Sequence, residues 1–417
     1  MKELLLRGVL VTSLSASPFI NSNATEFIDG SHLKLQLRNV YFNENFRDEN
    51  GLSPRAAKNA KSERTEWAQG FLLDFKSGFT PGTIGFGVDA LGLTGFKLDS
   101  GKGRSGTGLL AVGSDGQAAD EFASLGIAGK VRFAHTTVQH GSVLPKTPVL
   151  IYNDARLLPQ TYQGTLFTST DIDNLTLSGG RLNQFKLRDS SDSRSITPNG
   201  FTGQGAPFSF IGGEYTLGER TRLGYFYAQL DSFYRQHFVS VQHDQQWGTG
   251  LLTTDVRYFR SVDAGMQKAG AIDNTLLSGL LSYSIAGHRV GAGYQVLNGQ
   301  AGLPYITGAS VYSFSNAGIG KFIHEDEKTW MLSYGYDFSR VGLPGLTLSG
   351  RYLSGRNGKT GSAQLHEHER DAELAYVVQS GALKGVGLKM RNYVYRSDGA
   401  RGRDSNRLYL TYDIALW

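Results

Sequence analysis

The feature that most constrains the fold is an alternation of apolar and polar residues, repeated in stretches of about 7–11 residues. Successive side chains of a β-strand point to opposite sides, so this period of two predicts strands with one apolar face. The last stretch places these residues on its apolar face: Leu408, Leu410, Tyr412, Ile414 and Leu416. Its opposite face carries Arg407, Tyr409, Thr411, Asp413 and Ala415.

The same alternation occurs at residues 33–38, 64–75, 330–338, 346–352 and 386–391. The chain has no apolar run of the ~18 residues that a membrane-spanning helix needs. In lipid, a closed barrel is the other way to satisfy every backbone hydrogen bond. A soluble β-sandwich would also alternate. It fits less well, because Trp, Tyr and Phe lie near the strand ends and isolated Arg and Lys recur on the polar faces.

The connections between these stretches are of two kinds, as in outer-membrane barrels. Short ones lie at residues 78–82, 286–288 and 341–345, and long ones at 43–63, 101–120, 144–172, 188–204 and 297–328. Dividing the ~390 residues after the leader by ~20–22 per strand and connection gives about eighteen strands. The sequence therefore predicts an all-β, transmembrane antiparallel β-barrel as a single domain over residues 25–417.

The N-terminal segment, residues 1–24, resembles an export signal. Lys2 and Arg7 are basic, residues 9–20 form a short apolar stretch, and Ser22 and Ala24 are small residues at the spacing that a signal peptidase reads. A disordered leader is the alternative. The signal interpretation, together with the barrel, predicts export to a bacterial outer membrane.

Other chemistry finds little support in the sequence. The net charge of +5 is spread along the chain without a nucleic-acid-binding motif, so we expect no nucleic-acid partner. Residues 101–106 fit G-x-G-x-x-G, but residues 107–119 lack a helical period and predict a flexible loop with a basic tip. No catalytic motif appears, so the chain is predicted not to be an enzyme, and no cofactor is expected.

Two short segments concentrate imidazoles and carboxylates, at residues 324–327 and 366–369. Such groups bind divalent cations, but the same composition is typical of solvent-exposed loops. The sequence alone therefore predicts no metal site.

A set of basic residues falls on the polar faces of the predicted strands: Arg38, Arg64, Arg257, Arg351, Lys389, Arg391 and Arg407. An Arg facing lipid costs about 2–4 kcal/mol at the bilayer midplane, so these side chains are expected to face the lumen. They could merely balance lumenal carboxylates. A row of guanidinium groups would also attract anions and bind carboxylates with two hydrogen bonds.

Two long loops are too apolar to stand open in water, and we expect them to fold into the barrel and narrow it. The first, residues 145–162, would bring Tyr152, Asp154, Arg156 and Tyr162 to the constriction. The second, residues 297–328, would bring Tyr305, Tyr312, Ser313 and Asn316. Packing of these loops against the outer rim is the alternative.

Several motifs resemble the OprD-type family of substrate-specific porins of pseudomonads. They lie at residues 66–71, 88–93, 98–106, 153–161 and 376–379 within a similarity that spans about residues 27–417. The resemblance implies a monomeric eighteen-stranded barrel that sometimes associates as a weak homotrimer. It also implies a narrow eyelet beside a basic ladder that includes Arg64, Arg156, Lys389, Arg391 and Arg407. Lys389 stands where some relatives would have Arg. The positive charge is kept, but an ammonium group cannot bind a carboxylate through two parallel hydrogen bonds as a guanidinium does.

The resemblance implies passive uptake of small carboxylate substrates, with membrane lipid and lipopolysaccharide as the surrounding partners. Because the lumen shows no clear acidic cluster beyond Asp154 and Asp337, we favour aromatic or cyclic monocarboxylates. A channel of the same family for basic amino acids or peptides is the alternative. A barrel enzyme is the alternative from a different class.

Overall fold

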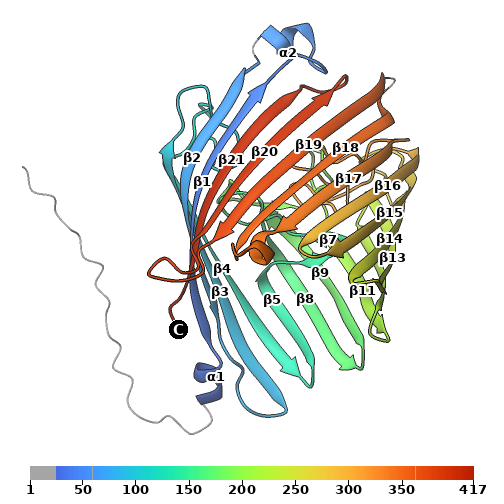
Figure 1. The fold of residues 1–417 in the computed structure, drawn as a ribbon. Helices are drawn as coiled ribbons and strands as arrows, with labels where there is room; N and C mark the ends of the chain where they lie inside the picture. Colours follow the sequence, from blue (N-terminus) through green and yellow to red (C-terminus); the bar gives the residue numbers. More distant parts are fainter. Residues whose placement is uncertain (1–24, 59, 362) are drawn as a thin grey trace, which may run out of the picture.

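The computed structural model describes residues 25–58, 60–361 and 363–417, so the predicted leader lies outside the described residues. Within this part of the chain, eighteen long antiparallel strands form a closed barrel (Figure 1), which confirms the predicted fold and strand number. None of the described helices combines the length and the apolar character needed to cross a bilayer.

The barrel strands follow the chain order. They are β1 (His32–Phe46), β2 (Glu63–Lys76), β3 (Ile84–Asp99), β4 (Glu121–Phe133), β5 (Thr136–Val143), β8 (Thr161–Ile172), β9 (Leu175–Lys186), β11 (Phe208–Leu217), β12 (Thr221–Leu230), β13 (Tyr234–Trp247), β14 (Gly250–Asp263), β15 (Asp273–Ile285), β16 (His288–Gln300), β17 (Lys328–Asp337), β18 (Leu346–Thr360), β19 (Ala363–Val377), β20 (Gly387–Ser397) and β21 (Arg403–Ala415).

The remaining elements are short. They are the helices α1 (Thr25–Asp29) and α2 (Pro54–Lys58), the 3-10 turn η1 (Phe338–Val341), the hairpin of β6 (Lys146–Thr147) with β7 (Leu150–Ile151), and β10 (Ser193–Ser195), which pairs with β9.

The first and last strands close the barrel. β1 pairs antiparallel with β21 from Lys34 opposite Ala415 to Phe46 opposite Arg403, and it pairs with β2 on its other side. No long strand therefore keeps a free edge, as a lipid environment requires.

The two rims differ as the sequence predicts. At the rim near α1, connections include the two-residue turn Ala286-Gly287, whose positive φ angles of 50° and 84° match the twist of a tight hairpin. At the opposite rim, near α2 in Figure 1, the connections include residues 47–62, 100–120 and 301–327. The long-loop rim is the extracellular side of an outer-membrane barrel.

The alternation is regular on the wall formed by β17 to β21, orange to red in Figure 1. On β17, Leu332 is 54% exposed on the outer face, whereas the neighbouring Met331 is buried in the lumen. On β19, Glu367 and Glu369 are buried on the inner side, while His366 and His368 are exposed on the outer side. Residues 366–369 therefore belong to a strand, and the expectation of a loop there was wrong.

On the opposite wall, much of the inner strand face is apolar as well as the outer one. Inward residues of β11 to β14 belong to a large buried cluster: Phe208, Phe210, Phe226, Phe238 and Phe259. The long loops pack on this cluster with residues such as Ile306 and Val311, so one side of the lumen is filled. Open space is left beside the wall of β17 to β21.

Three predictions about the loops need correction. The loop expected over 144–172 ends at residue 160, because Thr161–Ile172 forms β8, and β1 extends through residues 43–46. Residues 107–119 do not form an open loop, since Leu109 and Leu110 are fully buried. Thr107 anchors this segment by donating its backbone N–H to the buried carboxylate of Glu66 at 3.0 Å.

A substitution on the outer face of β17 tests which strand residues face lipid and which face the lumen. Leu332→Arg should lower the free energy of unfolding in lipid vesicles by about 2–4 kcal/mol, because the guanidinium would face the hydrocarbon. Urea titration followed by tryptophan fluorescence measures this change. Ser349→Arg, on the lumenal face of β18, should cost less than half as much. Equal costs for the two variants would contradict the assigned faces.

Candidate functional site

Three loops meet inside the barrel, namely residues 144–160, 187–207 and 301–327. The first and third are joined where the N–H of Ser310 donates to the carbonyl of Ile151 at 3.0 Å. The second and third are joined where the N–H of Asn199 donates to the carbonyl of Tyr305 at 2.8 Å. The two predicted inward loops are thus confirmed, and the loop at 187–207 completes the constriction.

The loop at 144–160 is fixed to the wall by charge and by packing. Arg38 of β1 donates from both terminal nitrogens to the carboxylate of Asp154, at 2.5 and 2.9 Å. The hydroxyl of Tyr409 donates to the carbonyl of Ala155 at 3.3 Å. Leu157 is fully buried among inward residues of β1 and β2.

The loop at 301–327 is held by polar groups of β18, β19 and β21. The backbone N–H groups of Ile319 and Gly320 donate to the Glu369 carboxylate, at 2.8 and 2.6 Å. Arg407 donates to the carbonyl of Gly318 at 3.0 Å, and Arg351 donates to the carbonyl of Asn316 at 3.1 Å. These bonds fix the loop backbone without consuming its side chains.

Between the loops and the β16–β21 wall lies a cavity of about 530 Å³, here called the basic cavity. Its seven basic residues are Arg156, Arg188, Arg289, Lys321, Arg351, Arg391 and Arg407, and its acidic residues are Asp371 and Glu373. The excess of basic over acidic side chains makes the electrostatic potential in the cavity positive.

Most of these charges have no internal counterion. Arg351 pairs with Asp371 at 2.7 Å, and Arg391 pairs with Glu373. Within the described residues, no carboxylate oxygen lies within 4.0 Å of the charged nitrogens of the other five basic residues. Of these five, Arg407 is buried, whereas Arg156, Arg188 and Lys321 are partly buried and Arg289 is exposed.

The basic groups also follow the wall lengthwise. Arg391 of β20 lies directly opposite Arg407 of β21, and Lys389 lies two residues further toward the short-turn rim. A strand rises about 3.4 Å per residue, so Lys389 is roughly 7 Å along the wall from that pair. Arg403 is the first residue of β21 and lies near the extracellular mouth. The charges therefore extend from the mouth through the constriction.

Lys321, in the third loop, is the basic group of the cavity whose charge depends most on pH. Burial, and next to it the charges of Arg188 and Arg156, lower the pKa of Lys321 from 10.5 to about 8. The ammonium form is present below that pH and is lost above it. An anion bound between these groups would favour the charged form.

The structure brings five of the predicted residues to the basic cavity: Arg156, Arg351, Arg391, Arg407 and Asn316. Lys389 lies below it, 4.0 Å from the carboxylate of Glu373.

Three predicted bases have other surroundings. Arg38 is neutralised by Asp154, as described above. Arg64 lies near the outer mouth, where it donates to the carbonyl of Gly106 at 3.2 Å. Arg257 forms a two-bond ion pair with Asp255, two residues away on the same face of β14, and its guanidinium stacks 4.0 Å from the ring of Tyr312.

The residues predicted to form the constriction also differ in their surroundings. Tyr162 was wrongly placed: it belongs to β8, is fully buried and packs against Phe185, because the lumen is filled on that side. Tyr152 is half-buried beside the Arg38–Asp154 pair, and Tyr305 stacks with Lys321 at 5.4 Å. Ser313 is buried and donates to Gln295 at 2.5 Å, so it supports the loop backbone.

Sequence reasoning missed three basic residues of the cavity. Arg289 alternates with the outward-facing Val290 on β16, so the parity argument could have predicted its lumenal position from the sequence. Arg188 and Lys321 lie in loops, where no periodicity tells which side chains face the lumen. Only the contacts among the three loops determine their positions.

A closed barrel with a narrowed, positively lined lumen defines a channel through the outer membrane. Comparison with known protein families agrees with this conclusion. The family model described as "outer membrane porin, OprD family" matches residues 25–416 of the chain. The chain belongs to this family, and it is a substrate-specific porin of the Gram-negative outer membrane.

Among its relatives is the porin-like protein GalP of Pseudomonas putida, 40% identical over 97% of each chain. The crystal structure of Pseudomonas aeruginosa OccK9 (OpdG) is 42% identical, covers 94% of this chain and 100% of its own, and has a TM-score of 0.90. The structure of Pseudomonas aeruginosa OpdK with vanillate is 36% identical, has the same coverage and has a TM-score of 0.88.

The pKa of Lys321 leads to a pH prediction. Raising the pH from 6.5 to 9.5 should neutralise Lys321 and lower the preference for chloride over potassium, which reversal potentials in planar bilayers measure. Lys321→Arg should remove most of this dependence, because guanidinium keeps its charge throughout the range. A pH response that is the same in wild type and Lys321→Arg would show that another group causes it.

Proposed function

We propose that the protein is a passive channel for small carboxylates, in which the basic residues of β20, β21 and the constriction loops form a ladder of binding groups. The observation that carries the proposal is the charge imbalance of the basic cavity, where five of seven basic groups have no carboxylate partner among the residues that the structure describes. As a passive channel, it needs neither catalysis nor an energy source.

The proposed path begins at Arg403 and Arg64 near the mouth and continues to Arg407 and Arg391 at the constriction. Opposed residues on neighbouring strands lie about 5 Å apart, so a carboxylate can bind the second guanidinium before it leaves the first. Lys389 then offers a single charge on the periplasmic side. Many sites of moderate strength suit conduction, since a substrate must both enter and leave.

We favour aromatic or cyclic monocarboxylates as substrates. Apolar groups of Ala317, Ile319 and Ala372 line the same cavity as the guanidinium groups, so a ring and a carboxylate have adjacent contacts. Vanillate, named with the related OpdK structure, is such a molecule. Each barrel has its own passage, so the proposal holds for a monomer or a weak trimer in lipid and lipopolysaccharide.

The second candidate is a channel for basic amino acids or peptides, which would need free carboxylates for the cationic end. Asp371 and Glu373 do face the basic cavity, and this observation favours it. Each is already paired with an arginine, however, which leaves less negative charge for a substrate.

Planar-bilayer recordings separate the two candidates. Benzoate and vanillate should reduce single-channel chloride current at concentrations at which arginine leaves it unchanged. Stronger block by arginine would favour the second candidate. Large conductance that none of these solutes changes would contradict a substrate-specific ladder.

Variants test the ladder itself. Arg391→Gln should weaken benzoate block roughly tenfold or more, because losing a charge-assisted hydrogen bond costs about 1.5–3 kcal/mol. The matched control is Arg257→Gln, which removes an inward-facing arginine of β14 that is paired with Asp255 of the same strand. The control should change block less than twofold. Equal effects would mean that general lumenal charge, and not the β20–β21 wall, attracts the substrate.

A further inference from the structure

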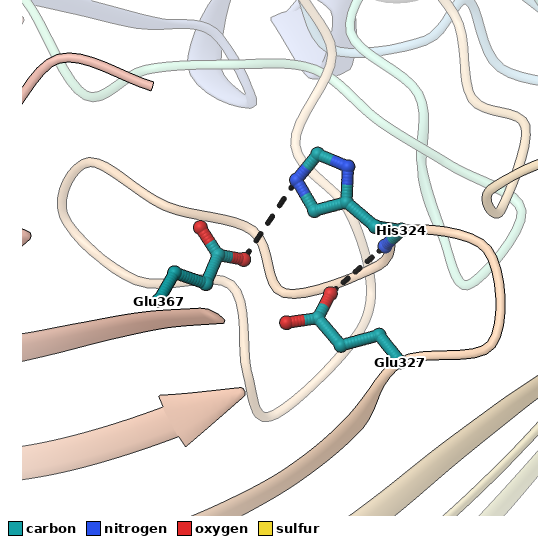
Figure 2. A group of neighbouring side chains, drawn as sticks. All are labelled: His324, Glu327 and Glu367. Carbon is teal, nitrogen blue, oxygen red and sulfur yellow. Dashed lines mark hydrogen bonds and ion pairs between the residues drawn. The ribbon is translucent and has the colours of Figure 1, made fainter. Parts of the chain in front are cut away.

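Two acidic side chains and a histidine converge on the extracellular side of the constriction, away from the proposed ladder. Glu327 ends the third loop, His324 lies three residues before it, and Glu367 projects inward from β19 (Figure 2). One ligand atom from each residue lies within 4.8 Å of the other two. The Nε2 atom of His324 is 3.7 Å from Oε1 of Glu367.

The two carboxylates are buried and incompletely satisfied. Glu327 is 0% exposed and Glu367 is 2% exposed. Within the described residues, Oε1 of each has no hydrogen-bond partner. A buried carboxylate oxygen without a donor is costly, and two of them side by side are more so. The geometry leaves room for one positive species between them.

The surroundings orient the three groups as metal ligands usually are. The second oxygen of Glu367 accepts a hydrogen bond from the hydroxyl of Tyr395. The second oxygen of Glu327 accepts one from the backbone N–H of His324 at 2.9 Å. Such outer contacts hold ligand side chains in place while their other oxygens stay free for an ion.

We propose that His324, Glu327 and Glu367 bind a divalent transition-metal ion of the zinc type, which ties the third loop to β19. Imidazole and carboxylate together suit Zn²⁺ and its neighbours, whereas Ca²⁺ takes six to eight oxygen ligands. Ligands of a tetrahedral ion at about 2.0–2.2 Å lie roughly 3.4 Å apart, so ligand atoms that now lie up to 4.8 Å apart must approach one another by up to about 1.4 Å.

An ion can reach the site from the lumen. His324 and Glu367 line a second cavity of about 530 Å³, and the side chain of His324 is 41% exposed. Water from this cavity would complete the coordination. Burial and the facing Glu367 raise the pKa of Glu327 well above its usual range, so a shared proton is the competing occupant.

The proposed ion would act on the passage through Lys321, which lies three residues before His324 and lines both cavities. Glu369 already holds the loop at Ile319 and Gly320, and the ion would add a second anchor two residues along β19. The loop should then fluctuate less when the metal is bound.

The first test measures metal binding without any substrate, so its result is independent of the proposed transport function. Full-length folded protein in detergent is stripped with EDTA, dialysed and titrated with Zn²⁺ in a calorimeter. We expect one ion per chain, and at least tenfold weaker binding of Ca²⁺. No binding, or tighter binding of Ca²⁺ than of Zn²⁺, would overturn the proposal.

Variants locate the site. His324→Ala and Glu327→Gln should each weaken Zn²⁺ binding at least tenfold. The matched control His366→Ala removes an exposed histidine next to Glu367 on the outer face of β19 and should change binding less than twofold. Heat-modifiable migration on gels checks that each barrel is folded. Unchanged binding in folded His324→Ala would refute the site.

Bilayer recordings test the anchoring role. Zn²⁺ added to EDTA-treated wild-type channels should reduce open-channel current noise, and EDTA should restore it. Glu327→Gln channels should show the higher noise with and without Zn²⁺. Equal noise in wild type before and after Zn²⁺ would show that the ion does not hold the loop.

Discussion

The passage depends on the packing of three loops against the inner aromatic face of β11 to β14. Without that packing, an eighteen-stranded barrel would enclose a wide aqueous lumen. The inward phenylalanines give the loops an apolar surface on which to fold, and they fill one side of the barrel. The remaining space lies off-centre, beside the polar wall. A solute in this space is therefore close to the basic side chains of that wall and far from the opposite side of the barrel.

The polar wall in turn positions the loops. Carboxylates on β19 accept from loop N–H groups, and arginines on β18 and β21 donate to loop carbonyls. Because the backbone satisfies these anchors, the loop side chains stay available to the lumen. The same residues thus shape the cavity and supply part of its charge, as Arg407 does by bonding Gly318 while lining the basic cavity.

The sequence predicts the barrel well because its outer face must be apolar wherever a strand meets lipid. Parity therefore assigned Arg351, Arg391 and Arg407 to the lumen correctly, and it would have assigned Arg289 too. Parity is weaker on β11 to β14: it assigned Arg257 to the lumen, but where both faces are apolar it could not distinguish the lumenal Phe238 from a residue in contact with lipid.

Loop residues are harder to predict, because contacts between segments far apart in the chain place them. Arg188 joins the cavity through Asn153 of another loop, at 2.9 Å, and nothing local indicates this. Tyr162 was expected at the constriction because the start of β8 carries no clear alternation. The convergence of Glu327 with Glu367 likewise joins residues on different elements.

The order in which these contacts can form has a kinetic meaning. Arg407 and Tyr409, in the final strand, bond to loops at Gly318 and Ala155, and β21 completes the barrel by pairing with β1. Contacts of such long sequence separation form late in folding. A chain that has not yet paired its last strand lacks these two contacts to the loops. The complete constriction is therefore a property of the finished barrel, because the strand that closes the wall is also the one that fastens the loops to it.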